Sequence, residues 1–233
     1  MEEESPVGSK TEHALKVLKR EGYDRGRGPA RSLSESQIQT LIDSTATSRS
    51  AWSTRDTALI AACYYGTLRV SEALNLDREH VKFLPTGEAD LVIAKSKTDQ
   101  TGRGSTITLP EEGTRHLHRW IEFAGIESGP VFRGIQNIWD AQFKIKPTRL
   151  GYPAALLIIK TRAKRSGLGK ITTHSLRRSH TRNLAERGAT LIELQRLGRW
   201  TDPSMPAHYS NHTGGQSSVV RKFYGTPKLK KIV

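Results

Sequence analysis

A histidine and an arginine three residues apart are the first candidates for chemistry in this sequence. His174 and Arg177 stand in T-H-S-L-R-R-S-H, and on a helix this spacing puts both side chains on one face, with Cβ atoms about 5–6 Å apart. An imidazole beside a guanidinium is a good receptor for a phosphate oxygen. Tyr209, farther along in P-A-H-Y, is a candidate nucleophile. With another arginine and a lysine at the same phosphate, such a site could perform phosphoryl transfer without a metal.

The composition favours a polyanionic partner. The chain has 233 residues, enough for one large domain or two small ones, and a formal net charge of +14. Nucleic acid is the commonest partner of such a basic protein, although charge alone does not separate DNA from RNA or an acidic membrane surface. The single cysteine, Cys63, excludes a disulfide within the chain and a cysteine-based zinc cluster. Without a signal peptide or an apolar run of about 18 residues, we expect a cytoplasmic protein with no membrane contact.

Two capping boxes mark the starts of helices. Ser34 with Gln37 precedes one apolar stripe, and Thr190 with Glu193 precedes another. The pattern of most of the remaining chain also predicts helices, over residues 110–124, 135–143, 154–163 and 174–187. Asp202 and the proline after it predict a further short helix that carries Tyr209.

A second arginine lies just after a helix break. The apolar segment that starts near Ser53 stops at Gly66, and Arg69 stands near the start of the next helical stretch. Helix N-termini favour anions, so this guanidinium would add to an existing preference for phosphate. The alternative is a surface ion pair between Arg69 and Glu72, three residues on.

A lysine is expected on a β-hairpin. The β-rich runs 91–94 and 106–109 flank the polar segment K-S-K-T-D-Q-T-G-R-G-S, which contains Lys95 and Lys97. A lysine in such a loop is either solvated, in contact with a DNA backbone, or catalytic. The cationic stretch 160–170 is likewise suited to phosphate contacts or to a solvated face. The expected fold class is α+β, mainly α-helical, with a small antiparallel sheet.

These motifs, in this order, resemble the tyrosine recombinase (integrase) family. Y-Y-G-T-L-R-V-S-E-A-L-N-L is similar to its first arginine motif, V-I-A-K-S-K-T with T-I-T-L-P to its lysine hairpin, and T-H-S-L-R-R-S-H-T-R-N-L to its H-x-x-R motif. Tyr209 stands nine residues after Trp200, the family's interval to its nucleophile. The resemblance covers about residues 31–213 and implies the catalytic domain of that family.

The sequence departs from the commonest family pattern at three points. Trp200 replaces the more frequent histidine, as in the Cre-type branch, and an indole N–H can only donate. Lys97 matches phage-integrase-like alignments and Lys95 the Xer branch; we favour Lys97. Residues 1–30 would be a leader and linker, where family members normally carry a core-binding domain. The alternatives are a truncated chain and a naturally reduced protein, and we expect truncation. Residues 214–233 would be a C-terminal helix and basic tail.

The resemblance implies a site-specific DNA recombinase or integrase. Tyr209 would attack a scissile phosphate and form a 3′-phosphotyrosyl intermediate, with no metal, cofactor or ATP. Strand exchange implies double-stranded DNA as the partner and a homo-tetramer on it, with a monomer expected in solution. Delivery of the tyrosine in cis or in trans is left open. The implied catalytic residues are Arg69, Lys97, His174, Arg177, Trp200 and Tyr209.

Roles for the other implied residues follow from their chemistry. The two guanidiniums of Arg69 and Arg177 would neutralise the equatorial oxygens of the phosphorane. His174 could accept the tyrosine proton, and Lys97 could protonate the leaving 5′-oxygen. Trp200 would donate a hydrogen bond to a phosphate oxygen.

Competing interpretations concern both the reaction and individual residues. The protein could be a type IB topoisomerase-like enzyme that relaxes DNA, or a non-catalytic DNA-binding module on a recombinase fold. Of the other tyrosines, only Tyr224 is a C-terminal alternative to Tyr209. The histidines His180, His208 and His212 are expected to be structural or to face DNA. His174 and His180 are six residues apart, which does not place them on one helix face as a metal pair.

Overall fold

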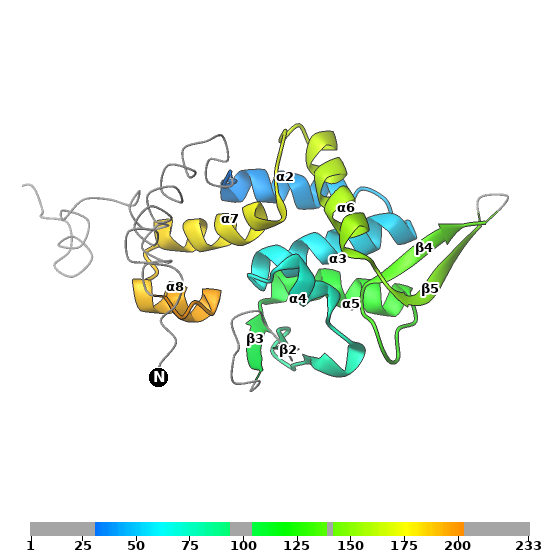
Figure 1. Ribbon diagram of the computed structural model, residues 1–233, viewed down its shortest axis with the longest axis horizontal. Coiled ribbons are helices and arrows are strands. Elements are labelled where there is room, and N and C mark those ends of the chain that lie inside the picture. Colours follow the sequence, from blue (N-terminus) through cyan, green and yellow to red (C-terminus); the bar gives the residue numbers. More distant parts are fainter. Residues whose placement is uncertain (1–30, 94–103, 139–141, 203–233) are drawn as a thin grey trace, which may run out of the picture.

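The computed structural model of the protein describes residues 31–93, 104–138 and 142–202 (Figure 1). Lys95, Lys97, Trp139 and Tyr209 therefore lie outside the described residues. The helices are α2 Glu35–Thr45, α3 Ala51–Tyr65, α4 Val70–Leu74, the short 3₁₀ helix η1 Arg78–His80, α5 Glu111–Phe123, α6 Tyr152–Arg165, α7 Thr173–Glu186 and α8 Leu191–Gly198. The strands are β1 Val81–Phe83, β2 Ala89–Ile93, β3 Ser105–Leu109, β4 Arg133–Asn137 and β5 Phe143–Arg149.

Helix α3 is the centre of the fold. It is packed between α5 on one side and α7 on the other (Figure 1), and all but two of its residues are buried. A helix surrounded by other elements needs apolar or small side chains all round rather than a single apolar stripe. The segment A-L-I-A-A-C from Ala58 to Cys63 meets this requirement, with every residue fully buried.

Both capping boxes predicted from the sequence are confirmed. The hydroxyl of Ser34 accepts from the backbone N–H of Gln37, whose side chain accepts from the backbone of Ser34. Thr190 and Glu193 make the same reciprocal pair at the start of α8. A helix N-terminus leaves four N–H groups without helical partners, and each box satisfies two donors, which makes these helix starts readable from local sequence.

The predicted lysine hairpin is present as strands β2 and β3. Together with β1 they form an antiparallel sheet in which β2 is central, and Leu91 lies opposite Ile107. Leu91, Ile93 and Leu109 are buried in the core. The residues between β2 and β3, which include both candidate lysines, lie outside the described part of the chain.

The helix predicted over 135–143 is wrong. Strand β4 pairs antiparallel with β5, so that Ile135 lies opposite Ile145 and both pack against the core. This hairpin projects from one side of the molecule (Figure 1). Ile135 and Ile138 are three residues apart, a spacing that suits a helix, but the structure is decided by pairing with the segment that follows. The described residues therefore contain two small sheets, where one was expected.

The base of this hairpin is tied to the end of α4. The guanidinium of Arg149 donates to the carbonyl oxygen of Leu74 and pairs with the carboxylate of Asp77 at 2.6 Å. Helix α4 has only five residues, too few to be stable on their own. The contacts of Arg149 therefore stabilise α4 from its C-terminal end.

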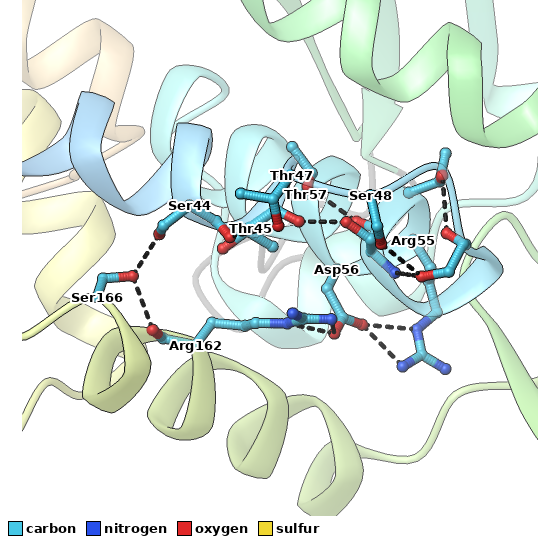
Figure 2. A network of polar contacts seen from close by, with 12 residues as sticks. Ser44, Thr45, Thr47, Ser48, Arg55, Asp56, Thr57, Arg162 and Ser166 are labelled. Atoms are coloured by element: carbon cyan, nitrogen blue, oxygen red, sulfur yellow. Dashed lines mark hydrogen bonds and ion pairs between the residues drawn. The ribbon is translucent and has the colours of Figure 1, made fainter.

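A buried ion-pair network joins α3 to α6 (Figure 2). One oxygen of Asp56 accepts from Arg55 at 2.7 Å and the other accepts from Arg162 at 2.8 Å. The network continues from the carbonyl oxygen of Arg162 through the hydroxyl of Ser166 to that of Ser44 on α2. A buried carboxylate is tolerated only when its lone pairs are satisfied, and here two guanidiniums satisfy them.

Polar contacts also fix α7 against α3. The Nδ1 atom of His180 lies 2.9 Å from the hydroxyl of Thr67, and its ring packs 4.8 Å from that of Tyr64. The Tyr64 hydroxyl in turn accepts from Asn183 at 3.0 Å. Burial lowers the pKa of His180 to about 4, with Arg187 as a smaller cause. The histidine is thus a neutral structural group at pH 7, in agreement with the structural role expected for it.

No helix in the described part of the chain combines the length and apolar character needed to cross a bilayer.

We predict that replacing His180 with glutamine makes the unfolding free energy depend less on pH between pH 6.5 and 4. Because the folded-state pKa of about 4 lies below the ordinary value of 6.5, this histidine's contribution is complete above pH 6.5. It is lost as the pH falls toward 4, by about 1.4 kcal/mol per pH unit. His180→Gln should cost stability at pH 7 and approach the wild type near pH 4, measured by urea unfolding. His118→Gln, at an exposed position, is the control, and an unchanged pH slope in His180→Gln would contradict the prediction.

Candidate functional site

A tight turn between α3 and α4 places Arg69. At Gly66, a Cβ atom would come within 2.7 Å of the Ala62 carbonyl oxygen and 3.2 Å of Ile107, so only glycine fits there. Thr67 follows with a φ of 49°, a strained conformation for a β-branched residue. Thr67 is fully buried, and both its hydroxyl and its carbonyl oxygen are hydrogen-bonded. These contacts hold the turn and leave Arg69 at the N-cap of α4.

The carboxylate of Glu72 is the centre of the site. One of its oxygens accepts from the Arg69 guanidinium at 2.5 Å, and the other accepts from the Arg69 backbone N–H at 2.8 Å. The second oxygen also pairs with Arg199 at 2.6 Å and lies 4.0 Å from Arg177. The alternative of an Arg69–Glu72 ion pair is therefore correct about the pair and wrong about its position, because only 3% of the Glu72 side chain is exposed.

Two of the guanidiniums, those of Arg199 and Arg69, keep Glu72 ionised. Burial by itself raises the pKa of a carboxyl group. At Glu72 this effect is outweighed by the charge of Arg199 and by the backbone and side-chain donors of Arg69, so the pKa lies below its ordinary value. The group is a fixed anion at neutral pH. Three cations around one anion leave an excess of positive charge, which suits the cluster to binding a phosphate.

Arg177 reaches this cluster from α7. Its guanidinium donates to the carbonyl oxygen of Thr67 at 2.7 Å and to that of Gly198, and its side chain is only 6% exposed. Arg69 is more accessible, with 22% of its side chain exposed. The structure thus brings together the two arginines that the sequence analysis selected.

Trp200 packs against the same arginine. The guanidinium carbon of Arg177 lies 5.1 Å from the centre of the indole ring, a cation–π contact. The ring also occupies the space that a side chain at Gly198 would need. The backbone of Trp200 is held at both ends by Gln195, whose carbonyl oxygen accepts its N–H and whose side chain donates to its carbonyl. The predicted hydrogen bond from the indole to a phosphate stays a prediction.

Sequence reasoning missed Arg199 and the central position of Glu72. Arg199 ends α8 in a left-handed conformation with φ 49°, and its guanidinium contacts both Glu72 and the Thr67 carbonyl. A signal was present in L-G-R-W, because a glycine at the end of a helix marks a turn that could direct the following side chain inward. The spacing of the motifs does not reveal which acidic residue forms ion pairs with the arginines.

The other selected residues are not all visible. His174 is exposed at the second position of α7, one turn before Arg177. Lys97, its alternative Lys95, and Tyr209 lie outside the described residues, so their predicted places in the site remain predictions.

Of the other tyrosines, Tyr64 is a core residue. Its hydroxyl accepts from Asn183, and burial raises its pKa. Tyr65 has a pKa raised by burial as well, and Tyr152 lies exposed at the start of α6. Within the described part of the chain, none of these three tyrosines forms a hydrogen bond or ring contact with Arg69, Arg177 or Arg199.

Comparison with known proteins gives one family. The family model described as "Phage integrase family" matches residues 31–215. The chain is 28% identical over 206 residues to an integrase/recombinase xerD homolog of Selenomonas ruminantium, which covers 84% of this chain and 58% of the relative. The chain thus spans little more than half the length of this curated relative.

Two solved structures share the fold. The XerH site-specific recombinase bound to palindromic difH substrate superposes with a TM-score of 0.65 at 16% identity, over 85% of this chain and 54% of that chain. The catalytic domain of bacteriophage HP1 integrase superposes with a TM-score of 0.57 at 16% identity, over 84% of this chain and 95% of that domain. The expected fold class, α+β and mainly helical, is confirmed.

We predict that Glu72→Gln destabilises the protein by about 3 kcal/mol at pH 7, because it leaves buried guanidiniums without their counter-charge. The pKa of Glu72 is lowered, so its contribution is present above pH 4.5 and is lost as the pH falls through the folded-state value. The difference in unfolding free energy between wild type and variant should therefore narrow as the pH falls below 4.5, as measured by chemical unfolding. Glu186→Gln, at an exposed pair with Arg182, should change stability by less than about 1 kcal/mol. Equal stability of Glu72→Gln and wild type would contradict this.

Proposed function

The chain belongs to the phage integrase family, and we propose that it is a tyrosine site-specific recombinase that cleaves and rejoins DNA strands. The reaction would pass through a 3′-phosphotyrosyl intermediate and need neither metal nor ATP. Since the chain spans 58% of the length of its xerD-like relative, the activity proposed is that of the protein to which this catalytic domain belongs.

The observation that carries this proposal is the arginine cluster. Arg69 follows α3 and Arg177 lies on α7, far apart in the sequence, yet both guanidiniums lie within 4.0 Å of the Glu72 carboxylate. A pentacoordinate phosphorane spreads negative charge over its equatorial oxygens, and two fixed guanidiniums complement that charge. Because buried contacts hold them in advance, little reorganisation is needed when the phosphate arrives.

The remaining roles complete the proposed mechanism. Tyr209 is the nucleophile, and it needs a proton acceptor because a phenol with a pKa of about 10 is mostly neutral at pH 7. His174, exposed one turn before Arg177, would take that proton directly or through water. Lys97 would protonate the leaving 5′-oxygen, and Trp200 would donate its indole N–H to a phosphate oxygen. The phosphotyrosyl bond conserves the energy of the ester, which allows religation to another strand.

Double-stranded DNA is the proposed partner, with a homo-tetramer on the DNA during strand exchange and a monomer in solution. The net charge of +14 supports a polyanionic partner. The XerH structure that shares this fold is described as bound to its difH DNA substrate. Residues 31–213 form the proposed catalytic domain, which the coverage of 95% of the HP1 integrase catalytic domain supports. The leader 1–30 and the C-terminal helix and tail 214–233 are proposed as its flanks.

The two other candidate activities are less well supported. The named relatives are recombinases or integrases, whereas a type IB topoisomerase would relax supercoils without exchanging strands. A non-catalytic DNA-binding module would have no need for the cluster of Arg69, Glu72 and Arg177 or for the tyrosine nine residues after Trp200.

We predict that Tyr209→Phe abolishes a covalent protein–DNA product. The substrate is a nicked suicide duplex, with candidate sites drawn from the DNA that flanks the gene, and the product is measured as a band on a denaturing gel. Loss of the phenol oxygen removes the attacking atom, so the yield should fall by at least about 1,000-fold while DNA binding is kept.

Tyr152→Phe is the matched control, because this tyrosine is exposed on α6 and should leave the band unchanged. A band that survives in Tyr209→Phe would move the assignment to Tyr224. Binding of DNA by the wild type without any covalent product would favour the non-catalytic alternative.

A further inference from the structure

We propose that Arg199 is a positioning residue that holds the two catalytic arginines in their working geometry. The inference rests on the proposed function, because it concerns the same phosphate site. It assigns a role to a side chain at the end of α8 that the motif pattern does not select.

Arg199 shares an acceptor with each of the other two arginines. Its Nη2 atom donates to Glu72 at 2.6 Å, and the same carboxylate accepts from Arg69. The Nη2 atom also lies 3.3 Å from the carbonyl oxygen of Thr67, which accepts from Arg177 at 2.7 Å. One guanidinium therefore links the turn before α4, the carboxylate on α4 and the end of α8.

Arg199 combines burial with a close ion pair, and this combination separates its role from direct contact with a substrate. Its side chain is 10% exposed and lies 2.6 Å from the Glu72 carboxylate. Arg69 is as close to Glu72 but is 22% exposed, and Arg177 is 6% exposed but lies 4.0 Å from Glu72. The Nε atom of Arg199 is also buried and has no hydrogen-bond partner among the described residues. A guanidinium that is both enclosed and closely ion-paired reaches a phosphate poorly and acts through the groups that it touches.

The charges explain what Arg199 does for Arg177. The nearest Glu72 oxygen is 2.6 Å from Arg199 but 4.0 Å from Arg177, so Arg199 supplies the close counter-charge at that oxygen. Arg177 lies farther from this oxygen and donates to the carbonyl oxygens of Thr67 and Gly198. Because the attraction between two charges falls with their separation, Arg177 keeps more of its attraction for a phosphate at 4.0 Å from Glu72 than it would in a close ion pair with Glu72. Without Arg199, Glu72 would draw Arg177 toward itself.

The backbone at Arg199 is itself specialised. Its φ of 49° and ψ of 45° lie in the left-handed region, where a long side chain is uncommon and glycine or asparagine is frequent. The strained conformation turns the chain directly after α8, so that Arg199 points to Glu72 while the next residue, Trp200, packs on Arg177. The contacts of the Arg199 side chain, and not the turn, explain why an arginine suits this position.

The test compares Arg199→Asn, Glu72→Gln and the double variant with the wild type. Asparagine tolerates the left-handed backbone, so the turn is kept while the guanidinium is removed. The readouts are the single-turnover rate of covalent complex formation on the nicked duplex and, separately, the DNA dissociation constant at fixed salt. Arg187→Asn, at an exposed pair with Glu35, is the control for loss of one positive charge.

We expect Arg199→Asn to slow cleavage by about 10- to 100-fold, because misplaced catalytic groups lose rate steeply. DNA affinity should change by no more than about threefold, and by no more than in Arg187→Asn. Since both substitutions break the same link, the double variant should be at most about threefold slower than the slower single variant.

Cleavage by Arg199→Asn within about twofold of wild type would overturn the inference, and so would single effects that simply multiply in the double variant. Either result leaves the proposed function intact. A wild-type protein that binds DNA but forms no covalent product would overturn the proposed function, and this inference with it.

Discussion

A single buried carboxylate determines the arrangement of the candidate site. Glu72 is almost completely enclosed and lies against three guanidiniums that come from the turn before α4, from α7 and from the end of α8. A buried charge is costly unless it is paired and hydrogen-bonded. These three segments therefore have to meet at Glu72 for the fold to be stable, and the same meeting creates a region with excess positive charge.

Helix α3 provides the frame on which this meeting depends. At its N-terminal end Asp56 joins it to α6 through Arg162, and at its C-terminal end Tyr64 joins it to α7 through Asn183. The strained turn at Thr67 follows directly and gives its carbonyl oxygen to Arg177. Strain of this kind persists only where surrounding contacts over-determine it, and such positions gather at functional sites.

The consequence for catalysis is preorganisation. The donors of the cluster are held by buried protein groups before any substrate arrives, so that their orientation has no further cost when charge develops on a phosphate. In the proposed mechanism, stability and catalysis depend on the same contacts. A change that loosens Glu72 is accordingly expected to affect both the unfolding free energy and the rate.

The sequence by itself determined the features that local chemistry controls. Both capping boxes and the pairing of Arg69 with Glu72 follow from residues a few positions apart. The two β-rich runs on either side of a polar segment indicated the β2–β3 hairpin, and the order of the motifs indicated the family. Tertiary structure alone decided that Glu72 is buried, that Arg199 joins it, and that β4 pairs with β5 where a helix was expected. The first two features depend on contacts between segments distant in the chain, and the third depends on pairing between two neighbouring segments that the spacing of apolar residues did not indicate. Spacing along a sequence specifies which side chains share a helix face, but it does not specify which other segment that face will meet.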